Sequence, residues 1–380
     1  MPTHVVILGA GFGGLELSSR LAEDLADEVE VTLIDKNDAF VFGFAKLDVM
    51  VGRRSLEEMR LPYRDMAKVN LTFRQETILS IDPMTRRVVT DGGVLEADIL
   101  VVALGADLDP AATPGLVEGG FEFYSPEGAA RTRDALESFQ AGTILISVLG
   151  PFFKCPPAPI EAAFLLHDLF TRRGTRNAVE IHLLSPLPLP IPVSPETSAA
   201  IVGMLADRGI TWWPQTLVTH LDPDAPLAHL ADGRSLPYDL FLGIPVHRAP
   251  EVVLESGLAE DGWIPVDPAT FATRFADVYA VGDVTSAPVP RAGVIAEGEA
   301  RTVADVLVAR LRGGDPPAPY AGDAVCYIEM GDDTVGRVDV NFLAGDSVTS
   351  AFTPPSLEVA AEKVEFGASR RTRWFGHPPA

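Results

Sequence analysis

The chain contains two cysteines, Cys155 and Cys326, and residues suited to thiol chemistry lie near the first of them. Lys154 directly precedes Cys155 and is a local positive charge of the kind that favours a thiolate. Glu161 follows near the start of a predicted helix, where it is either a base or a carboxylate stabilised by the helix dipole. The two cysteines form either a redox pair or two unpaired core thiols. Because they lie far apart in the chain, the sequence alone does not show whether they touch.

A glycine-rich turn near the N-terminus predicts a dinucleotide-binding site. The apolar run at residues 5–8 is typical of a strand buried on both faces. Gly9, Gly11 and Gly14 follow it as G-x-G-x-x-G and lead into a predicted helix. The first glycine permits a tight turn, the second lets a pyrophosphate approach the backbone, and the third lets helix and strand pack closely. Asp35 ends the next predicted strand, where a carboxylate receives the ribose hydroxyls.

Two further motifs indicate that the dinucleotide is FAD. TRFADVYAVGDVT, at 273–285, resembles the second FAD fingerprint of the two-dinucleotide-domain flavoprotein disulfide reductase superfamily, whose aspartate, here Asp283, holds the ribityl chain. VVALGA, at 101–106, resembles the middle motif of that superfamily. The helix predicted to start after residues 290–293 would point its positive end at the flavin. The residues expected to bind FAD are Gly9, Gly11, Gly13, Gly14, Asp35, Lys36, Ala103, Gly105, Gly282, Asp283 and Gly293.

The second predicted domain lacks the glycines that a nicotinamide cofactor needs. In superfamily members that oxidise NAD(P)H, a second G-x-G-x-x-G follows a strand of this domain. Here the strand GTILISVLG, at 142–150, leads into Pro-Phe-Phe-Lys-Cys155, so that phenylalanine and cysteine replace the second and third glycines. Both side chains would crowd a pyrophosphate. We therefore expect that NADH is not the electron donor.

The cysteine motif resembles one found in sulfide-oxidising flavoproteins. CPPAPIE, starting at Cys155, is similar to the CPPxPYE stretch of the sulfide:quinone oxidoreductases and of the flavocytochrome c sulfide dehydrogenases. In those families this cysteine lies over the flavin, and its partner is a C-terminal cysteine near "CY", which matches Cys326 in AVCYIEMG. The resemblance extends over roughly residues 3–330 and includes EDGWIPVDPATFATRFADVYAVGDV, ahead of the second FAD motif.

This resemblance implies sulfide oxidation at the two cysteines. Hydrosulfide would attack a disulfide between Cys155 and Cys326, leaving a persulfide on one sulfur and a thiolate on the other. Sulfide would leave as persulfide or polysulfide, and two electrons would pass through FAD to a quinone or another acceptor. Lys154 would favour the thiolate, and Glu161 would serve as the base. A low-molecular-weight thiol or persulfide is an alternative substrate.

The chain departs from those families in two respects. Many sulfide:quinone oxidoreductases have a third cysteine where this chain has Tyr124 and Ser125, so sulfur-chain growth on three cysteines is excluded. The two-cysteine pattern is nearer to the flavocytochrome subunit, which is exported and binds a haem partner. This chain shows no export signal, so no haem subunit is expected.

A quinone would need an apolar slot beside the flavin. From chain order alone, its expected walls are Tyr327, Ile328, Phe352, Trp374 and Phe375. The basic residues Arg370, Arg371 and Arg373 precede two of these aromatics, a combination that suits an anionic membrane surface. A terminal helix docked on the core by its aromatic residues is the alternative.

Composition limits the partners and the location of the protein. The chain has 53 acidic and 30 basic residues and a formal charge of -23, so nucleic acid is not an expected partner. The N-terminus has no signal peptide, and no apolar stretch is long enough to span a bilayer. We expect a cytoplasmic protein, in peripheral contact with the inner face of the membrane if at all. The seven histidines show no metal-ligand spacing, and no metal is expected.

Recurring strand–helix–strand units predict an α/β fold with two doubly wound Rossmann-like domains and a small C-terminal region. The expected FAD domain is discontinuous, at 1–108 and 265–312. A second domain at 109–264 would carry Cys155, and residues 313–380 would carry Cys326. DLFLGIPVHRAP, at 239–250, predicts one further strand, and a short helix is expected at the C-terminus. The sequence does not indicate an oligomeric state.

Two other functions fit parts of this pattern. A type II NADH:quinone oxidoreductase would share the FAD domain but needs the missing glycines of the second domain. A flavin-binding redox sensor would use the disulfide as a switch without turnover.

Overall fold

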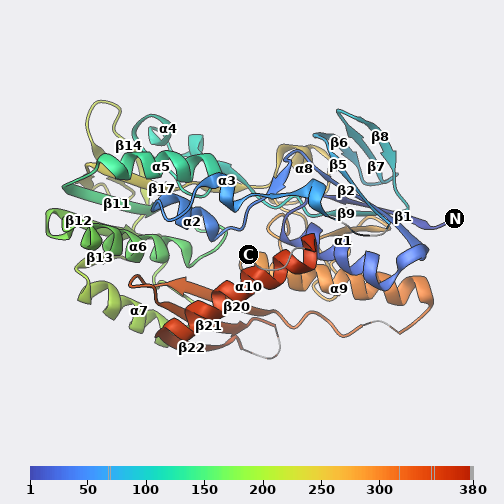
Figure 1. Cartoon of the computed structure of the whole chain (residues 1–380). Coiled ribbons are helices and arrows are strands. Elements are labelled where there is room, and N and C mark those ends of the chain that lie inside the picture. Colours follow the sequence, from blue (N-terminus) through green and yellow to red (C-terminus); the bar gives the residue numbers. More distant parts are fainter. Residues whose placement is uncertain (67, 69, 316, 344, 346, 377–380) are drawn as a thin grey trace.

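The apolar run near the N-terminus forms the central strand of a five-stranded parallel sheet (Figure 1). One face of this sheet packs on the neighbouring helices α1 (Phe12–Asp24) and α9 (Gly293–Arg312). The other face packs on an antiparallel sheet of β6 (Ile78–Asp82), β7 (Arg87–Thr90) and β8 (Gly93–Glu96). Both faces of the central strand are therefore covered, as its unbroken apolar sequence predicts. The strands, in spatial order, are β19 (Val278–Ala280), β9 (Ile99–Val102), β1 (Thr3–Leu8), β2 (Val29–Asp35) and β5 (Leu71–Gln75).

The second domain repeats this construction around a four-stranded parallel sheet. Helix α6 (Ala158–Arg172) packs on one face of it. The antiparallel strands β14 (Val218–Leu221), β15 (Leu227–Leu230) and β16 (Ser235–Pro237) cover the other. Helices α5 (Pro126–Ser138) and α7 (Pro195–Asp207) complete the domain. The strands, in spatial order, are β13 (Ile210–Trp213), β12 (Val179–Leu184), β11 (Gly142–Val148) and β17 (Leu240–Ile244).

The single strand expected at 239–250 is wrong, because the chain forms two strands there. Strand β17 ends at Ile244 in the second parallel sheet, and β18 (Val246–Arg248) pairs with β10 (Asp107–Asp109) in a separate antiparallel ribbon. Pro245 lies between them and has no N–H for a continuous ladder. The ribbon pairs the two stretches of chain that connect the domains.

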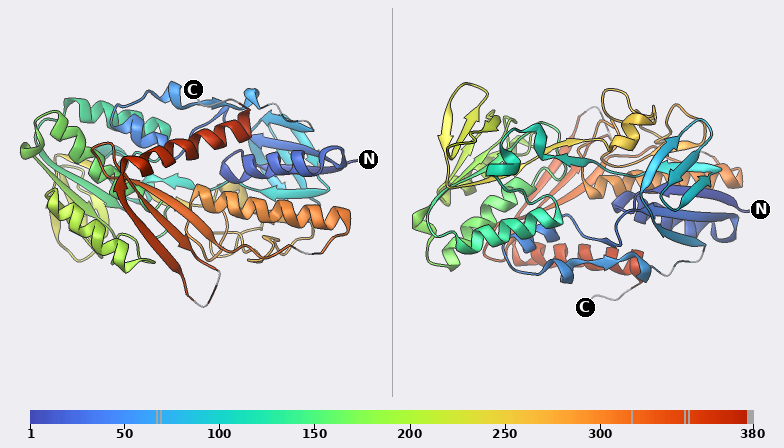
Figure 2. Two further views of the ribbon diagram at one scale, coloured as in Figure 1. Left: turned by 60° about the horizontal axis from the view of Figure 1, so that its bottom comes forward. Right: turned by 90° about the horizontal axis from the view of Figure 1, so that it is seen from above.

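The C-terminal region is an antiparallel sheet followed by a long helix. Strands β20 (Asp323–Glu329), β21 (Val335–Asn341) and β22 (Thr349–Ser356) lead into α10 (Leu357–Phe375), which Ser356 caps. Figure 2 shows α10 running from this sheet to α1 of the first domain. The expectation of a short terminal helix is wrong, since α10 has 19 residues.

The end of α10 is fixed by a buried carboxylate of α1. Trp374 packs edge-on against the ring of Phe12, 5.7 Å away, and donates its indole N–H to Glu16 at 2.9 Å. Arg301 and Arg373 donate to the two oxygens of the same carboxylate at 2.7 and 2.8 Å. Burial alone would raise the pKa of Glu16, but these hydrogen bonds outweigh it and lower the pKa to about 2.

The structure describes residues 1–66, 68, 70–315, 317–343, 345 and 347–376. Among its described helices, none combines the length and the apolar character that crossing a bilayer requires.

The sheets divide the chain as the Rossmann-like pattern predicts, whereas the exact domain boundaries stay a prediction. The remaining elements are β3 (Ala39–Phe40), α2 (Ala45–Met50), α3 (Leu56–Met59), β4 (Leu61–Pro62), α4 (Leu116–Gly119), α8 (Glu251–Glu255) and four short 3-10 turns at Ala26–Glu28, Tyr63–Asp65, Pro110–Ala112 and Arg176–Ala178.

Replacing Glu16 by glutamine should destabilise the fold in a pH-dependent way. Because the pKa of Glu16 is lowered in the folded state, its ionised form contributes stability above its ordinary pKa of roughly 4.3. That contribution, about 3 kcal/mol at neutral pH, is lost as the pH falls towards 2. Urea unfolding at several pH values should show the wild-type advantage shrinking over this window. Glu23→Gln on the exposed side of α1 is the control and should change the free energy of unfolding by less than about 1 kcal/mol.

Candidate active site

A cavity of about 290 Å³ lies where the two domains and the C-terminal region meet. Cys155 and Cys326 both line it, so the structure brings the only two cysteines of the chain to one site. Three groups of side chains surround them. The N-terminal domain contributes Gly11, Phe12, Gly13, Phe40, Val41, Gly43, Phe44, Lys46, Leu47, Ala103, Gly105, Val281, Gly282, Asp283, Ala292, Gly293, Val294 and Ala296. The rest of the wall is Phe123, Tyr124, Lys154, Pro157, Ala158 and Glu161 from the second domain, and Val325, Tyr327, Lys363 and Phe366 from the C-terminal region.

The glycine turn between β1 and α1 has the geometry of a phosphate cradle. Gly9 has a φ of +99°, and a Cβ there would lie 2.4 Å from the carbonyl oxygen of Ala103. A Cβ at Gly14 would lie 1.9 Å from the carbonyl oxygen of Gly9. Gly11 instead faces open space and lines the cavity, and no side chain caps the first turn of α1. The free N–H groups of this helix end suit the pyrophosphate of a dinucleotide.

The carboxylate expected at the ribose lies beside this turn. Asp35 ends β2, and its side chain accepts hydrogen bonds from the backbone N–H groups of Ala10, at 2.8 Å, and Asn37, at 2.9 Å. The neighbouring Lys36 accepts a bond from Gln75 through its carbonyl oxygen. Neither Asp35 nor Lys36 belongs to the wall of the cavity itself. The other expected cofactor residues in that wall are Gly13, Ala103, Gly105, Gly282, Asp283 and Gly293.

Asp283 brings a buried carboxyl group to the cavity wall. Burial raises its pKa, although the charges of Lys154, Arg291 and Lys46 act in the opposite direction. Gly293 begins α9, and a Cβ there would lie 2.7 Å from the ring of Phe12. The residues of the three motifs therefore fit a flavin dinucleotide, since they combine an open glycine cradle, an uncapped helix end and polar groups around one cavity.

Cys155 has an unusual backbone conformation. Its φ is +54°, in the left-handed region that costs a non-glycine residue about 1–2 kcal/mol. The turn is held because Cys155 donates its N–H to the carbonyl oxygen of Arg291 at 2.8 Å and accepts the N–H of Ala158 at 2.9 Å. The hydroxyl of Tyr124 also donates to its carbonyl oxygen, at 3.4 Å. Such strain, supported here by two other segments of the chain, is common at functional sites.

Both cysteines are free thiols in a low-dielectric environment. Burial, and then the charges of Glu161 and Cys326, raise the pKa of Cys155 far above its ordinary value. Burial and Glu161 likewise raise the pKa of Cys326 to about 12. Lys154 lines the same cavity and donates to the carbonyl oxygen of Ala106 at 3.1 Å, and its expected support of a thiolate stays a prediction. The reduced pair thus keeps its protons at neutral pH unless a base removes them.

Glu161 is placed to be that base. It lies in the first turn of α6 with 2% of its surface exposed, and it accepts the backbone N–H of Glu329 at 3.1 Å. Burial raises the pKa of Glu161, whereas the charge of Lys363 and the hydrogen bond from Glu329 lower it. The resulting pKa is about 7. A carboxyl group with this pKa exchanges a proton readily near neutral pH.

Sequence reasoning missed two lysines of the cavity wall. Lys46 donates to the carbonyl oxygen of Tyr124, and burial followed by repulsion from Lys154 lowers its pKa to about 8. Lys363 comes from α10 and lies 3.8 Å from Glu161. Both lysines lower the pKa of Cys155. No motif marks either residue, since only the packing of α2 and α10 brings them to the cysteines.

The structure brings one of the five expected quinone-pocket residues to the cavity. Tyr327 belongs to its wall, where its ring lies 5.6 Å from that of Phe366. The other four do not line it, because their side chains pack elsewhere in the core: Ile328, Phe352, Trp374 and Phe375. Phe44 and Phe366 supply the aromatic surface that the sequence assigned to the C-terminal pair.

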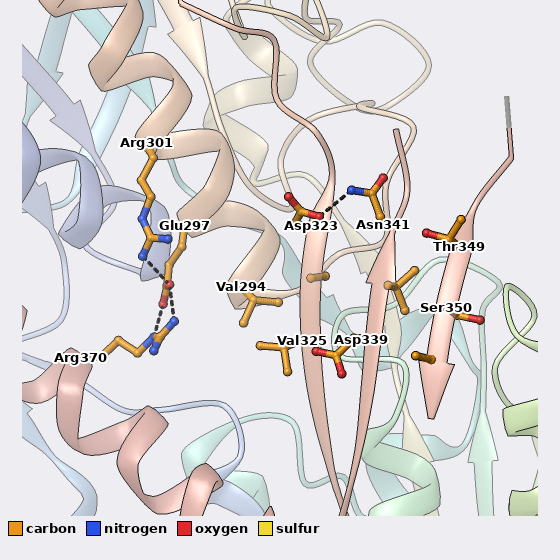
Figure 3. Close-up of a pocket in the computed structure, with 13 residues that line it drawn as sticks. Val294, Glu297, Arg301, Asp323, Val325, Asp339, Asn341, Thr349, Ser350 and Arg370 are labelled. Atoms are coloured by element: carbon orange, nitrogen blue, oxygen red, sulfur yellow. Dashed lines mark hydrogen bonds and ion pairs between the residues drawn. The ribbon is translucent and has the colours of Figure 1, made fainter. Parts of the chain in front are cut away.

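A second, more open cleft of about 470 Å³ adjoins the cavity (Figure 3). Val294 and Val325 line both spaces, and the rest of the second cleft is mainly polar. Figure 3 shows Arg301 and Arg370 pointing towards Glu297 from two helices, and Arg370 binds it at 2.9 Å. Arg370, like Arg373, therefore contacts the protein's own carboxylates, as expected of a docked terminal helix.

Replacing Gly11 or Gly14 of the turn by alanine should have different effects on flavin binding and on stability. At Gly11 the methyl group meets no protein atom, so the flavin-free protein should unfold at an unchanged temperature while most flavin binding is lost. At Gly14 the methyl group meets backbone, so Gly14→Ala should destabilise the fold itself by about 1–3 kcal/mol or more. Flavin content per chain and thermal unfolding separate the two effects. Equal flavin retention by Gly11→Ala and the wild type would contradict the cradle.

Comparison with known proteins places this fold and site among flavin-dependent oxidoreductases. The family model "Pyridine nucleotide-disulphide oxidoreductase" matches residues 3–146 and 159–305. The chain is 27% identical to the sulfide-quinone reductase of Aquifex aeolicus over 361 residues, covering 88% of this chain and 82% of that protein. It is 22% identical over 367 residues to the mitochondrial sulfide:quinone oxidoreductase of Mus musculus, covering 92% and 80%. It is 33% identical to a type II NADH:quinone oxidoreductase of Staphylococcus saprophyticus over 120 residues, which cover 31% of this chain and 30% of that protein.

A solved structure shows the same fold. The crystal structure of the Aquifex aeolicus sulfide:quinone oxidoreductase matches with a TM-score of 0.88 and 24% identity, covering 98% of this chain and 92% of that one. This likeness confirms the predicted fold class of two Rossmann-like domains with a C-terminal region. Because the family model also covers most of the sequence, the chain belongs to the pyridine nucleotide-disulphide oxidoreductase family.

Proposed function

We propose that this chain is an FAD-dependent sulfide dehydrogenase of the sulfide:quinone oxidoreductase type. The observation that carries the proposal is the meeting of Cys155 and Cys326 in the wall of the cavity that the flavin motifs also line. Relatives named sulfide-quinone reductase match nearly the whole chain, which supports sulfide and a quinone as the substrates. The phenylalanine and cysteine at the second glycine motif argue against NADH as the donor.

The cofactor would be FAD, held along the cavity by the motif residues. Gly11 and the first turn of α1 would bind the pyrophosphate, and Asp35 would bind the ribose. Asp283 would hold the ribityl chain, and the N-terminus of α9 at Gly293 would approach the ring system. These assignments agree with the open space at Gly11 and with the polar groups on the same wall.

The two cysteines would work as a disulfide that opens and closes in each turnover. Hydrosulfide attacks one sulfur of the Cys155–Cys326 bond, which breaks and leaves a persulfide on one cysteine and a thiolate on the other. A second hydrosulfide attacks the outer sulfur of the persulfide and leaves with it as hydrogen disulfide. Both cysteines are then in the reduced form. FAD bound in the cavity would accept the two electrons released when the cysteines reclose and pass them to the acceptor.

Glu161 would take the proton that hydrogen sulfide or a cysteine thiol must lose. The two thiols do not ionise unaided at neutral pH, because desolvation in the cavity raises the pKa of both. Glu161 faces the same cavity, and its pKa of about 7 leaves a large fraction of it deprotonated. The charge of a thiolate at Cys155 would be compensated by Lys46 and Lys363.

The acceptor would be a quinone reached through the aromatic side of the cavity. Tyr327, Phe44 and Phe366 form that side. Since long-chain quinones reside in membranes, the protein would act as a peripheral protein at the cytoplasmic face. Leu357 and Val364 of α10 are large apolar side chains exposed by 69% and 73%, and they support such a contact.

Cys155→Ser should abolish flavin reduction by sulfide while the flavin stays bound. An anaerobic absorbance titration of the purified protein checks this, with the wild type and Cys326→Ser measured in parallel. In the wild type, sulfide should bleach the flavin maximum and produce a long-wavelength charge-transfer band. Both serine variants should lose the bleaching, because neither can form the disulfide that hydrosulfide attacks.

Samples with NADH in place of sulfide test the other two functions. Fast bleaching of the wild type by NADH and not by sulfide would favour a type II NADH:quinone oxidoreductase. Reduction by sulfide that is slow and stoichiometric, with no turnover when a short-chain quinone is added, would favour a redox sensor.

Glu161→Gln should slow flavin reduction mainly at neutral and alkaline pH. A base acts only when deprotonated, so the wild-type rate divided by the variant rate should rise through about pH 7 and then level off. The plateau is expected to be roughly 100-fold or more, which is typical of a general base. Because both rates are measured at the same pH and the same total sulfide concentration, the ionisation of sulfide affects them equally and cancels in the ratio. A ratio that does not change with pH would assign Glu161 a structural role only.

A further inference from the structure

A row of charged side chains leads from Glu161 away from the cavity. The ammonium of Lys363 lies 3.8 Å from Glu161 and donates to the carboxylate of Glu329 at 2.7 Å. Arg53 holds the other oxygen of Glu329 at 3.1 Å and lies 3.7 Å from Asp48. These five residues come from α2 and its following turn, α6, β20 and α10, and each contacts the next.

The two outer residues of this row are more exposed than the three inner ones. The side-chain exposure is 2% for Glu161, 10% for Lys363 and 13% for Glu329, and it reaches 26% for Asp48 and 29% for Arg53. The row therefore connects a buried acid in the cavity wall with solvent. Glu161 needs such a connection, because a buried base must give up its proton after every turnover.

The charges of the row are suited to hold one mobile proton. The three carboxylates of the row outnumber its two cations, and Arg53 is also shared with the buried Asp168, 3.6 Å away. Burial raises the pKa of Asp48 and that of Glu161. The pKa of Glu329 is instead lowered, because the positive charges of Lys363 and Arg53 outweigh the effect of its burial. The groups that interact electrostatically with Glu161 are Lys363 on α10, Glu329 on β20, Asp48 on α2, and Cys155, Cys326 and Tyr124 around the cavity.

We propose that Lys363 and Glu329 form the proton outlet of the active site, which opens to solvent beside Asp48 and Arg53. The proposal rests on the sulfide oxidation proposed above. A proton leaves an S–H group for the Glu161 carboxylate. Lys363 takes the proton of Glu161 and gives one of its own ammonium protons to Glu329 in the same step, so that it stays charged throughout. Glu329 finally releases its proton to water at the exposed end, and the row returns to its starting charges.

The test follows proton release and flavin reduction together in the flavin-loaded protein. Stopped-flow mixing with sulfide in weak buffer records the flavin maximum and a pH-indicator dye in the same reaction. In the wild type, the proton should appear as fast as the flavin is reduced. In Lys363→Met, proton release should lag behind reduction at least tenfold, and added imidazole should restore it by accepting the proton directly.

A second variant and a control keep the result interpretable. Glu329→Gln preserves the backbone N–H that binds Glu161 and the size of the side chain, but it cannot accept a proton, so it should show the same lag and the same rescue. Arg312→Gln removes an exposed arginine that pairs with Glu28 on the far side of α1, and it should behave as the wild type.

Three outcomes are distinguishable. A lag in both variants that imidazole removes supports the outlet. Proton release as fast as reduction in both variants, with normal reduction in the wild type, overturns the outlet and leaves the proposed function standing. A wild-type flavin that sulfide does not reduce overturns the proposed function, and the outlet inferred for it falls as well.

Discussion

The site depends on the close approach of the β1–α1 turn to the end of strand β9. The carbonyl oxygens of Gly9 and Ala103 lie where Cβ atoms of other residues would be, so helix, turn and neighbouring strand share one small volume. This contact fixes the uncapped start of α1 at the carboxyl edge of the sheet, where β9 and β19 also end. Parallel strands thereby bring the three flavin motifs to one edge although they are distant in sequence. The second domain and the C-terminal region form the other sides of the cavity.

Burial is the second determinant of the chemistry. A low-dielectric cavity keeps Cys155, Cys326 and Glu161 protonated more strongly than water would, because each would carry a negative charge when ionised. Three negative charges in such a volume would repel one another, and Lys46 and Lys363 offset part of that repulsion. The site therefore disfavours states in which more than one of these three groups is ionised.

The local parts of this structure could be predicted from the sequence, and the long-range parts could not. The strand–turn–helix at Gly9–Gly14 and the helix after Gly293 follow from glycine chemistry and apolar patterning, which act over a few residues. The cysteine motif likewise identified the site through its own neighbours. Lys363 carries no such local signal, because it reaches Glu161 only through the packing of α10. Trp374 was assigned to a pocket on chain order, whereas the buried carboxylate of α1 decides where its ring lies.

The docking of α10 on α1 has a consequence for how the protein is made. The rings of Phe12, Phe40 and Phe42 are covered by Trp374, which lies more than 300 residues later in the chain. During synthesis the N-terminal domain therefore leaves the ribosome with an apolar patch and the acidic Glu16 without their partners. These remain uncovered until α10 has been translated, so contacts of α1 are completed by a helix from far along the chain.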